Sequence, residues 1–136
     1  MIKIIYGAKG TGKTKMIIDS ANECGAGSAG DVVFLSDTSR YVRDIKYVIR
    51  FVNTVDNEIN SADALLGFIK GLIAGNYDIK NMFIDGATRM INIPIDEMGA
   101  FMEELDKIAK KFDVNFTLTV SRDLAEMPKF FLEYID

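Results

Sequence analysis

The residues best suited to chemistry in this sequence lie close to its start. Gly7, Gly12, Lys13 and Thr14 stand at the spacing G-x-x-x-x-G-K-[ST], which is the motif of a phosphate-binding loop. Glycines allow backbone N–H groups to wrap around a polyphosphate because they bend tightly and lack a Cβ atom. In such a loop the lysine reaches the β and γ phosphates, and the hydroxyl of the next residue binds Mg²⁺. The motif predicts that all eight residues hold phosphate: Gly7, Ala8, Lys9, Gly10, Thr11, Gly12, Lys13 and Thr14.

A second candidate for chemistry is a carboxylate at the end of an apolar segment. The segment 81–85 reads Asn-Met-Phe-Ile-Asp and is expected to be a strand that ends on Asp85. Mg²⁺ prefers hard oxygen ligands, and a carboxylate opposite the Thr14 hydroxyl would help to hold it. Asp85 is therefore predicted to act with Thr14 at a magnesium ion.

The elements beside the loop must point it at the ligand. An apolar strand at 2–6 is expected before it, and a helix from Lys13 to about Cys24 after it, with Met16, Ile17 and Ala21 inward. The positive end of that helix would face the phosphates. Gly25 is predicted to cap the helix in a left-handed conformation, and 25–30 to be a flexible connector.

The rest of the chain alternates between apolar runs and helical patterns. Strands are expected at 32–35, ending at Ser36-Asp37, at 47–52, and at 115–120, ending at Ser121. Residues 38–46 fit either a helical turn or a loop. Ser61 should cap a helix that ends at Gly75, and Pro94 should lie in the first turn of the longest helix, which runs to Phe112. The tail at 129–135 is expected to be a short edge strand, with a docking segment as the alternative.

This order of elements predicts one domain over residues 1–136, of the α/β class. It should form a three-layer, open, mainly parallel sheet with helices on both faces. Ligands of such sheets lie beyond the carboxyl ends of the strands. Gly7, Asp37, Asp85 and Ser121 should therefore converge at one edge.

Composition removes several classes of function. The chain has no histidine and one cysteine, Cys24, so histidine-based nucleophilic catalysis, a Cys/His zinc site and an internal disulfide are excluded. A net charge of −4 does not indicate binding to nucleic acid, although a local basic patch remains open. No apolar run is long enough for a membrane span, and the start of the chain leaves no room for a signal peptide, so we expect a cytoplasmic protein.

The loop GAKGTGKT, the strand NMFIDG and the segment LDKIAKKFDVNFTLTVS resemble P-loop NTPases with a RecA-like ATPase core, including those of replicative helicases. The resemblance implies that ATP and Mg²⁺ bind with Lys13 and Thr14 at the phosphates, Asp85 at the metal and Ser121 near the γ-phosphate. It implies Asp37 as the nearest match to the glutamate that positions the attacking water. The catalytic set expected is therefore Lys13, Asp37, Asp85 and Ser121.

The chain also resembles type II thymidine kinases, which share this core and a similar loop. Those enzymes have a glutamate base directly after the aspartate and a zinc-bound lasso, whereas this sequence has Gly86 and no zinc ligands. Three classes remain open: an ATPase, a nucleoside or nucleotide kinase, and an ATP-binding module without turnover. RecA-like domains often complete their sites with an arginine of a neighbouring subunit, so a homo-oligomer is a further possibility, with Arg40, Arg89 and Arg122 as candidate arginines.

Overall fold

The computed structural model describes residues 1–27 and 30–135. Its strands are β1 (Ile2–Tyr6), β2 (Asp31–Ser36), β3 (Arg50–Asn53), β4 (Ile79–Asp85) and β5 (Asn115–Val120). Its α-helices are α1 (Lys13–Gly27), α2 (Ala62–Gly75), α3 (Ala87–Ile91), α4 (Gly99–Phe112) and α5 (Lys129–Leu132), and its 3₁₀-helices are η1 (Val42–Asp44), η2 (Ile95–Glu97) and η3 (Leu124–Glu126).

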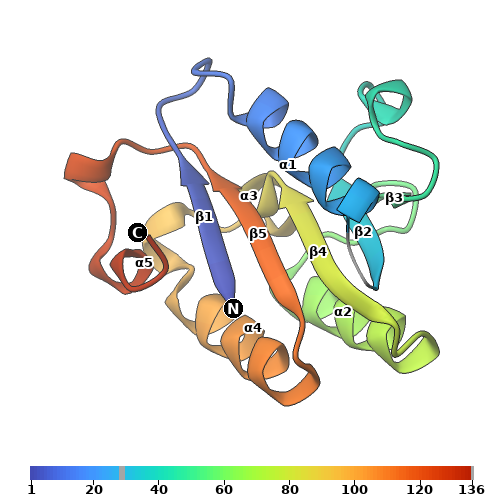
Figure 1. The fold of residues 1–136 in the computed structure, drawn as a ribbon. Helices are drawn as coiled ribbons and strands as arrows, with labels where there is room; N and C mark the ends of the chain where they lie inside the picture. Colours follow the sequence, from blue (N-terminus) through green and yellow to red (C-terminus); the bar gives the residue numbers. More distant parts are fainter. Residues whose placement is uncertain (28–29, 136) are drawn as a thin grey trace.

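The described strands form one parallel sheet in the order β1-β5-β4-β2-β3. The chain passes from β1 to β2 through α1, and returns towards β1 through α2 and then through α3 and α4 (Figure 1). Because parallel crossovers are right-handed, these opposite directions place α1 on one face and α2, α3 and α4 on the opposite face. The expected three-layer α/β arrangement is present, and the sheet is wholly parallel among the described strands.

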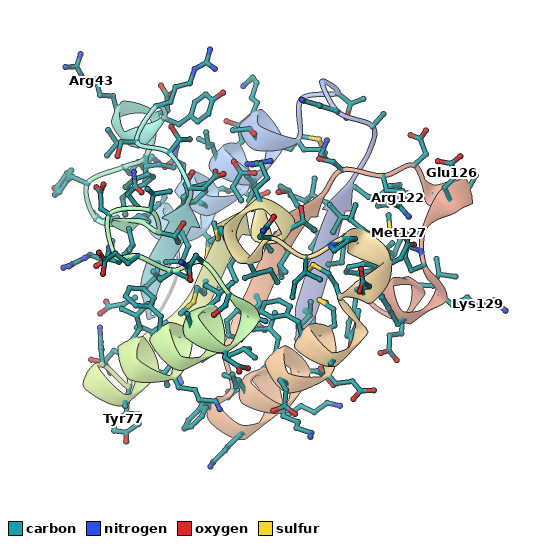
Figure 2. All side chains as sticks on the ribbon, turned by 180° about the vertical axis from the view of Figure 1, so that it is seen from behind. Arg43, Tyr77, Arg122, Glu126, Met127 and Lys129 are labelled. Atoms are coloured by element: carbon teal, nitrogen blue, oxygen red, sulfur yellow. The ribbon has the colours of Figure 1, made fainter. Side chains whose placement is uncertain are left out.

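Each face of the sheet carries its own apolar cluster, because alternate residues of a strand point to opposite faces. On the α1 side, Ile17 and Ala21 pack against Phe34 of β2 and Phe83 of β4. On the other side, the buried residues of α2, α4 and α5 pack against a larger set that includes Leu35. Figure 2 shows this second layer from behind, with α2 and α4 in front of the sheet. The two layers hold the carboxyl ends of the strands at one edge.

Several sequence predictions about α1 and the following segments need correction. Met16 is exposed rather than inward, and α1 continues past Gly25 to Gly27, so Gly25 is not a left-handed cap. The part of the predicted connector at 28–29 lies outside the described residues. The third strand starts at Arg50 rather than Tyr47, because the backbone turns just before it, with a hydrogen bond from Ile49 N–H to Lys46 O.

The predictions for the second half were right about its main elements and wrong about some boundaries. Ser61 caps α2 as expected, with its Oγ accepting from the Ala64 N–H at 3.1 Å. Pro94 does not begin the longest helix: it precedes η2, Met98 separates η2 from α4, and α1 is longer than α4. The tail is not an edge strand, since it forms α5 and buries Phe131 against the larger apolar cluster.

Candidate functional site

The predicted phosphate-binding loop connects the end of β1 to the start of α1. Gly10 and Gly12 adopt φ values of 84° and 86°, which residues with a Cβ atom rarely reach. Between them, the Thr11 N–H and hydroxyl both donate to the Ala8 carbonyl, at 3.3 and 2.7 Å. The Gly7 N–H donates to the Arg122 carbonyl at 3.1 Å, which ties the loop to the segment after β5. The loop is thus a tight bend that requires its glycines.

The amides inside this bend are available to a ligand. Within the described part of the chain, the N–H groups of Gly10, Gly12, Lys13 and Thr14 have no hydrogen-bond partner, and the first helical bond runs from the Met16 N–H to the Gly12 carbonyl. Unpaired amides at the start of a helix attract anions, and the dipole of the 15-residue helix adds to this attraction. The bend therefore presents several donors to one anionic group.

Lys13 lies across the bend. Its side chain is largely buried, with the whole residue 8% exposed, and its Nζ donates to the Ala8 carbonyl at 2.9 Å. An ammonium group in this place adds positive charge where the amides already point. A phosphate that enters the bend would have to replace the Ala8 carbonyl as the partner of Nζ.

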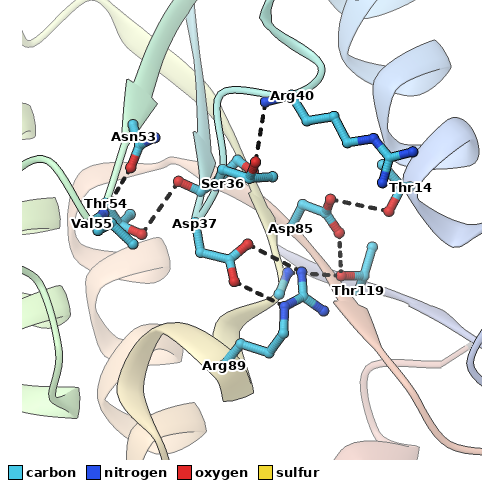
Figure 3. Close-up of polar contacts among 12 residues, drawn as sticks. Thr14, Ser36, Asp37, Arg40, Asn53, Thr54, Val55, Asp85, Arg89 and Thr119 are labelled. Atoms are coloured by element: carbon cyan, nitrogen blue, oxygen red, sulfur yellow. Dashed lines mark hydrogen bonds and ion pairs between the residues drawn. The ribbon is translucent and has the colours of Figure 1, made fainter.

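Asp85 ends β4, as the sequence predicts, and is held by two hydroxyl groups (Figure 3). The Thr14 hydroxyl donates to Oδ2 at 3.2 Å, and the Thr119 hydroxyl donates to Oδ1 at 2.8 Å. Thr119 in turn accepts from the Gly86 N–H at 3.0 Å, which fixes the direction of its hydroxyl. Thr119 was not among the predicted site residues.

The oxygens of Thr14 and Asp85 fit a magnesium ion. Two neighbouring ligands of an octahedral Mg²⁺ lie about 3 Å apart, given Mg–O distances of about 2.0–2.1 Å, and Thr14 Oγ1 and Asp85 Oδ2 are 3.2 Å apart. No group of three or more Asp, Glu, Cys or His side chains suited to a metal occurs in residues 1–27 and 30–135. A magnesium ion here would therefore complete its coordination with phosphate oxygens and water.

Asp37 follows β2 and is engaged by an arginine of the same chain. Arg89, from α3, donates from Nε to Oδ2 at 2.9 Å and from Nη2 to Oδ1 at 3.2 Å (Figure 3). The hydrogen bond to Asp37 raises the pKa of Arg89 above its ordinary value; burial opposes this shift, and the charges of Asp37 and Asp85 add to it. The two residues are 52 positions apart, and nothing in the sequence pattern predicted their pairing.

Two cavities open at this edge of the sheet. The first, of about 330 Å³, is lined by Lys9, Gly10, Gly12, Lys13, Thr14, Tyr41, Asp85, Arg89, Thr119 and Ser121. The second, of about 580 Å³, is lined by Gly12, Thr14, Lys15, Ile18, Asp19, Asn22, Tyr41 and Asp44. Gly12, Thr14 and Tyr41 border both, so the cavities are neighbours. Of the predicted catalytic residues, Lys13, Asp85 and Ser121 line the first cavity. Asp37 does not line it and is paired with Arg89, which does.

The other two candidate arginines lie outside both cavities. Arg40 is exposed, and its guanidinium is 5.4 Å from the centre of the Tyr41 ring. Arg122, labelled in Figure 2, donates from Nη1 to Asp96 Oδ1 at 2.8 Å.

Comparison with known proteins finds no family model that matches this chain and no curated protein that is significantly similar to it. Among the described residues, no helix has both the length and the apolar character needed to cross a membrane.

Proposed function

We propose that this chain binds the magnesium complex of a nucleoside triphosphate, which we expect to be ATP, and hydrolyses it as a RecA-like P-loop NTPase. One observation carries the proposal: the Thr14 hydroxyl, at the start of α1, is hydrogen-bonded to Asp85 at the end of β4. It joins the glycine-rich bend to the carboxylate, although the two lie 71 positions apart. The parallel sheet and the polar strand ends agree with the same family.

Each part of the site has a role in this proposal. The amides of Gly10, Gly12 and the first turn of α1 would hold the β-phosphate, and Lys13 would turn from the Ala8 carbonyl to the β and γ phosphates. Thr14 and Asp85 would hold the magnesium ion, which when bound neutralises charge that develops on the phosphate oxygens. Thr119 keeps the Asp85 carboxylate oriented.

The second cavity supports a nucleotide rather than phosphate alone. It begins beside the loop, at Gly12 and Thr14, and has apolar walls from Ile18 and Tyr41. An aromatic ring and an aliphatic side chain suit a flat base, and the Asp44 carboxylate suits ribose hydroxyls, which donate hydrogen bonds. We therefore assign the nucleoside half of the ligand to this cavity.

One feature favours a second candidate, a nucleotide-binding module without turnover. Among the described residues that line the first cavity, Asp85 is the only carboxylate, and it is bonded to two hydroxyls. Asp37 is paired with Arg89, and Gly86 follows Asp85. A group that activates water would therefore have to be either Asp37, released from Arg89, or a residue supplied by another chain.

Titration of the protein with ATP, GTP and ADP, with and without Mg²⁺, tests binding. We expect a magnesium-dependent triphosphate complex that raises the free energy of unfolding by about 2.7 kcal/mol at a ligand concentration 100 times Kd. Lys13→Ala should remove this shift because it deletes the phosphate-binding cation. Phosphate release, measured over a range of protein concentrations, separates the ATPase from the module, which would bind without turnover.

Lys70→Ala is the matched control, since Lys70 is an exposed lysine of α2 away from both cavities. It should bind as the unaltered protein does. Equal binding by the unaltered protein and the Lys13→Ala variant would contradict the proposal.

A further inference from the structure

The ion pair between Arg89 and Asp37 stands at the border of the proposed phosphate site. The guanidinium uses Nε and Nη2 to hold both oxygens of Asp37, at 2.9 and 3.2 Å. An arginine has five N–H donors, so three are left over. The side chain of Arg89 is 55% exposed, that of Asp37 only 21%, and only Arg89 lines the first cavity. The arginine thus still has donors for a ligand while the carboxylate is covered.

The backbone after Asp85 is in a left-handed conformation, and this guanidinium lies against it. Gly86 has a φ of 87°, and a Cβ atom placed there would overlap the Arg89 guanidinium, with Cζ only 2.6 Å away. Gly86 stands where type II thymidine kinases have a glutamate, and its positive φ gives it a local reason to be glycine. It lets Arg89 fold back over the end of β4, towards the Asp85 carboxylate.

The charges of the cavity predict a competition for Arg89. Lys9, Lys13 and Arg89 are its cationic side chains among the described residues, and Arg89 alone has an ion-pair partner there. A triphosphate brings its densest negative charge on the terminal phosphate, which binds arginine through strong charge-assisted hydrogen bonds. Asp37 offers the same guanidinium a weaker, single negative charge.

We propose that Arg89 donates hydrogen bonds to the terminal phosphate of the nucleotide bound to its own chain. Asp37 is then an internal anion that competes with that phosphate for the guanidinium. This inference rests on the proposed nucleotide site. It assigns Arg89 a role within one chain, whereas the sequence offered Arg89 as one of three candidates for a role across a subunit interface. A diphosphate, which lacks the terminal group, leaves the Arg89–Asp37 pair intact.

The test compares triphosphate and diphosphate affinities by calorimetry. The probes are the magnesium complexes of the β,γ-imido analogues of ATP and GTP, beside ADP and GDP. Arg89→Gln should weaken triphosphate binding by about 10- to 100-fold, as expected for charge-assisted hydrogen bonds, and change diphosphate binding by less than about threefold. Asp37→Asn should strengthen triphosphate binding, because the competing anion is removed.

Two further variants make the result specific. In Arg89→Gln combined with Asp37→Asn, the gain from Asp37→Asn should vanish, since the competition needs the guanidinium. Arg50→Gln removes an exposed arginine of β3 and should leave all affinities unchanged. Arg89→Lys keeps the positive charge but lacks the paired donors of the planar guanidinium, so its triphosphate affinity should lie between those of the unaltered protein and Arg89→Gln. It replaces Arg89→Gln in the test if that variant does not fold.

Equal weakening of triphosphate and diphosphate by Arg89→Gln would overturn the assignment of Arg89 and leave the nucleotide site standing. So would weaker triphosphate binding by Asp37→Asn. If the unaltered protein binds none of the four nucleotides, the site itself is overturned, and the role of Arg89 with it.

Discussion

At the scale of single residues, the Asp85 carboxylate depends on the hydroxyl of Thr119. This residue lies two positions before Ser121, which the sequence predicted as a site residue. Thr119 Oγ1 donates to Asp85 and accepts from the Gly86 N–H, and both Thr119 and Asp85 are nearly excluded from water. Removing this hydroxyl leaves a buried carboxylate oxygen and a buried amide without a partner. The loss of one partner costs more than the bond itself contributes, because desolvation is no longer compensated.

Thr119→Val is therefore expected to lower the free energy of unfolding by about 1–3 kcal/mol, and Thr119→Ser by much less. Urea unfolding followed by circular dichroism measures the difference. Thr117→Val is the matched control on the same strand, as Thr117 is partly exposed and should change stability by no more than about 0.5 kcal/mol. Equal stability of the two valine variants would contradict the assigned role of Thr119.

The sequence predicted the loop and Asp85 because their signals are local. The loop is a contiguous motif, and Asp85 ends a contiguous apolar run. Thr119 was not predicted because its role depends on strand register. Ile84 pairs with Leu118, so the residues that follow them, Asp85 and Thr119, lie side by side. The Arg89–Asp37 pair depends likewise on β2 and β4 being neighbours, which the sequence pattern does not specify.

At the scale of elements, α4 ends on a residue in an unfavourable backbone conformation. Asp113 has φ 54° and ψ 51°, and the next residue, Val114, donates its N–H to the Ala109 carbonyl at 3.1 Å. The left-handed conformation costs an L-residue about 1–2 kcal/mol, whereas glycine adopts it freely. Sequence reasoning placed the end of this helix at Phe112 correctly but did not identify the left-handed residue after it.

Asp113→Gly should accordingly stabilise the protein by about 0.5–1 kcal/mol, after the greater flexibility of glycine in the unfolded chain is counted. Lys107→Gly, in the exposed middle of the same helix, should destabilise it by about 1 kcal/mol. Thermal and urea unfolding of both variants give the comparison. A loss of stability in both would show that the left-handed end of α4 is not strained.

Boundaries were harder to predict than elements, for reasons of packing. The apolar residues from 95 to 112 share one helical spacing, but the chain breaks at Met98, which is itself 1% exposed and buried in the larger cluster. Tyr47 has a high strand propensity, yet it is 97% exposed in a turn before β3. Burial of Met98 decided the first boundary, and the turn closed by the Ile49 N–H and the Lys46 carbonyl decided the second; neither is part of a hydrophobic pattern or a strand propensity.

At the scale of the whole molecule, the two apolar clusters share the same strands. Phe34 of β2 faces α1, whereas its neighbours Val33 and Leu35 face the opposite layer. Neither layer can lose its packing without exposing one face of the common sheet. The described structure therefore predicts that residues on both sides unfold in one cooperative transition.

Single tryptophans test this, because the chain contains none. Phe51→Trp reports on the α1 side, where Phe51 stacks on Phe34 with ring centres 6.0 Å apart. Phe130→Trp reports on the other side, where Phe130 meets Phe131 edge to face at 4.6 Å. Within each variant, the urea midpoint from fluorescence should coincide with that from far-ultraviolet circular dichroism. A fluorescence midpoint well below the circular-dichroism midpoint in the Phe130→Trp variant would instead mean that α5 detaches before the sheet unfolds, and that the tail is an independent unit.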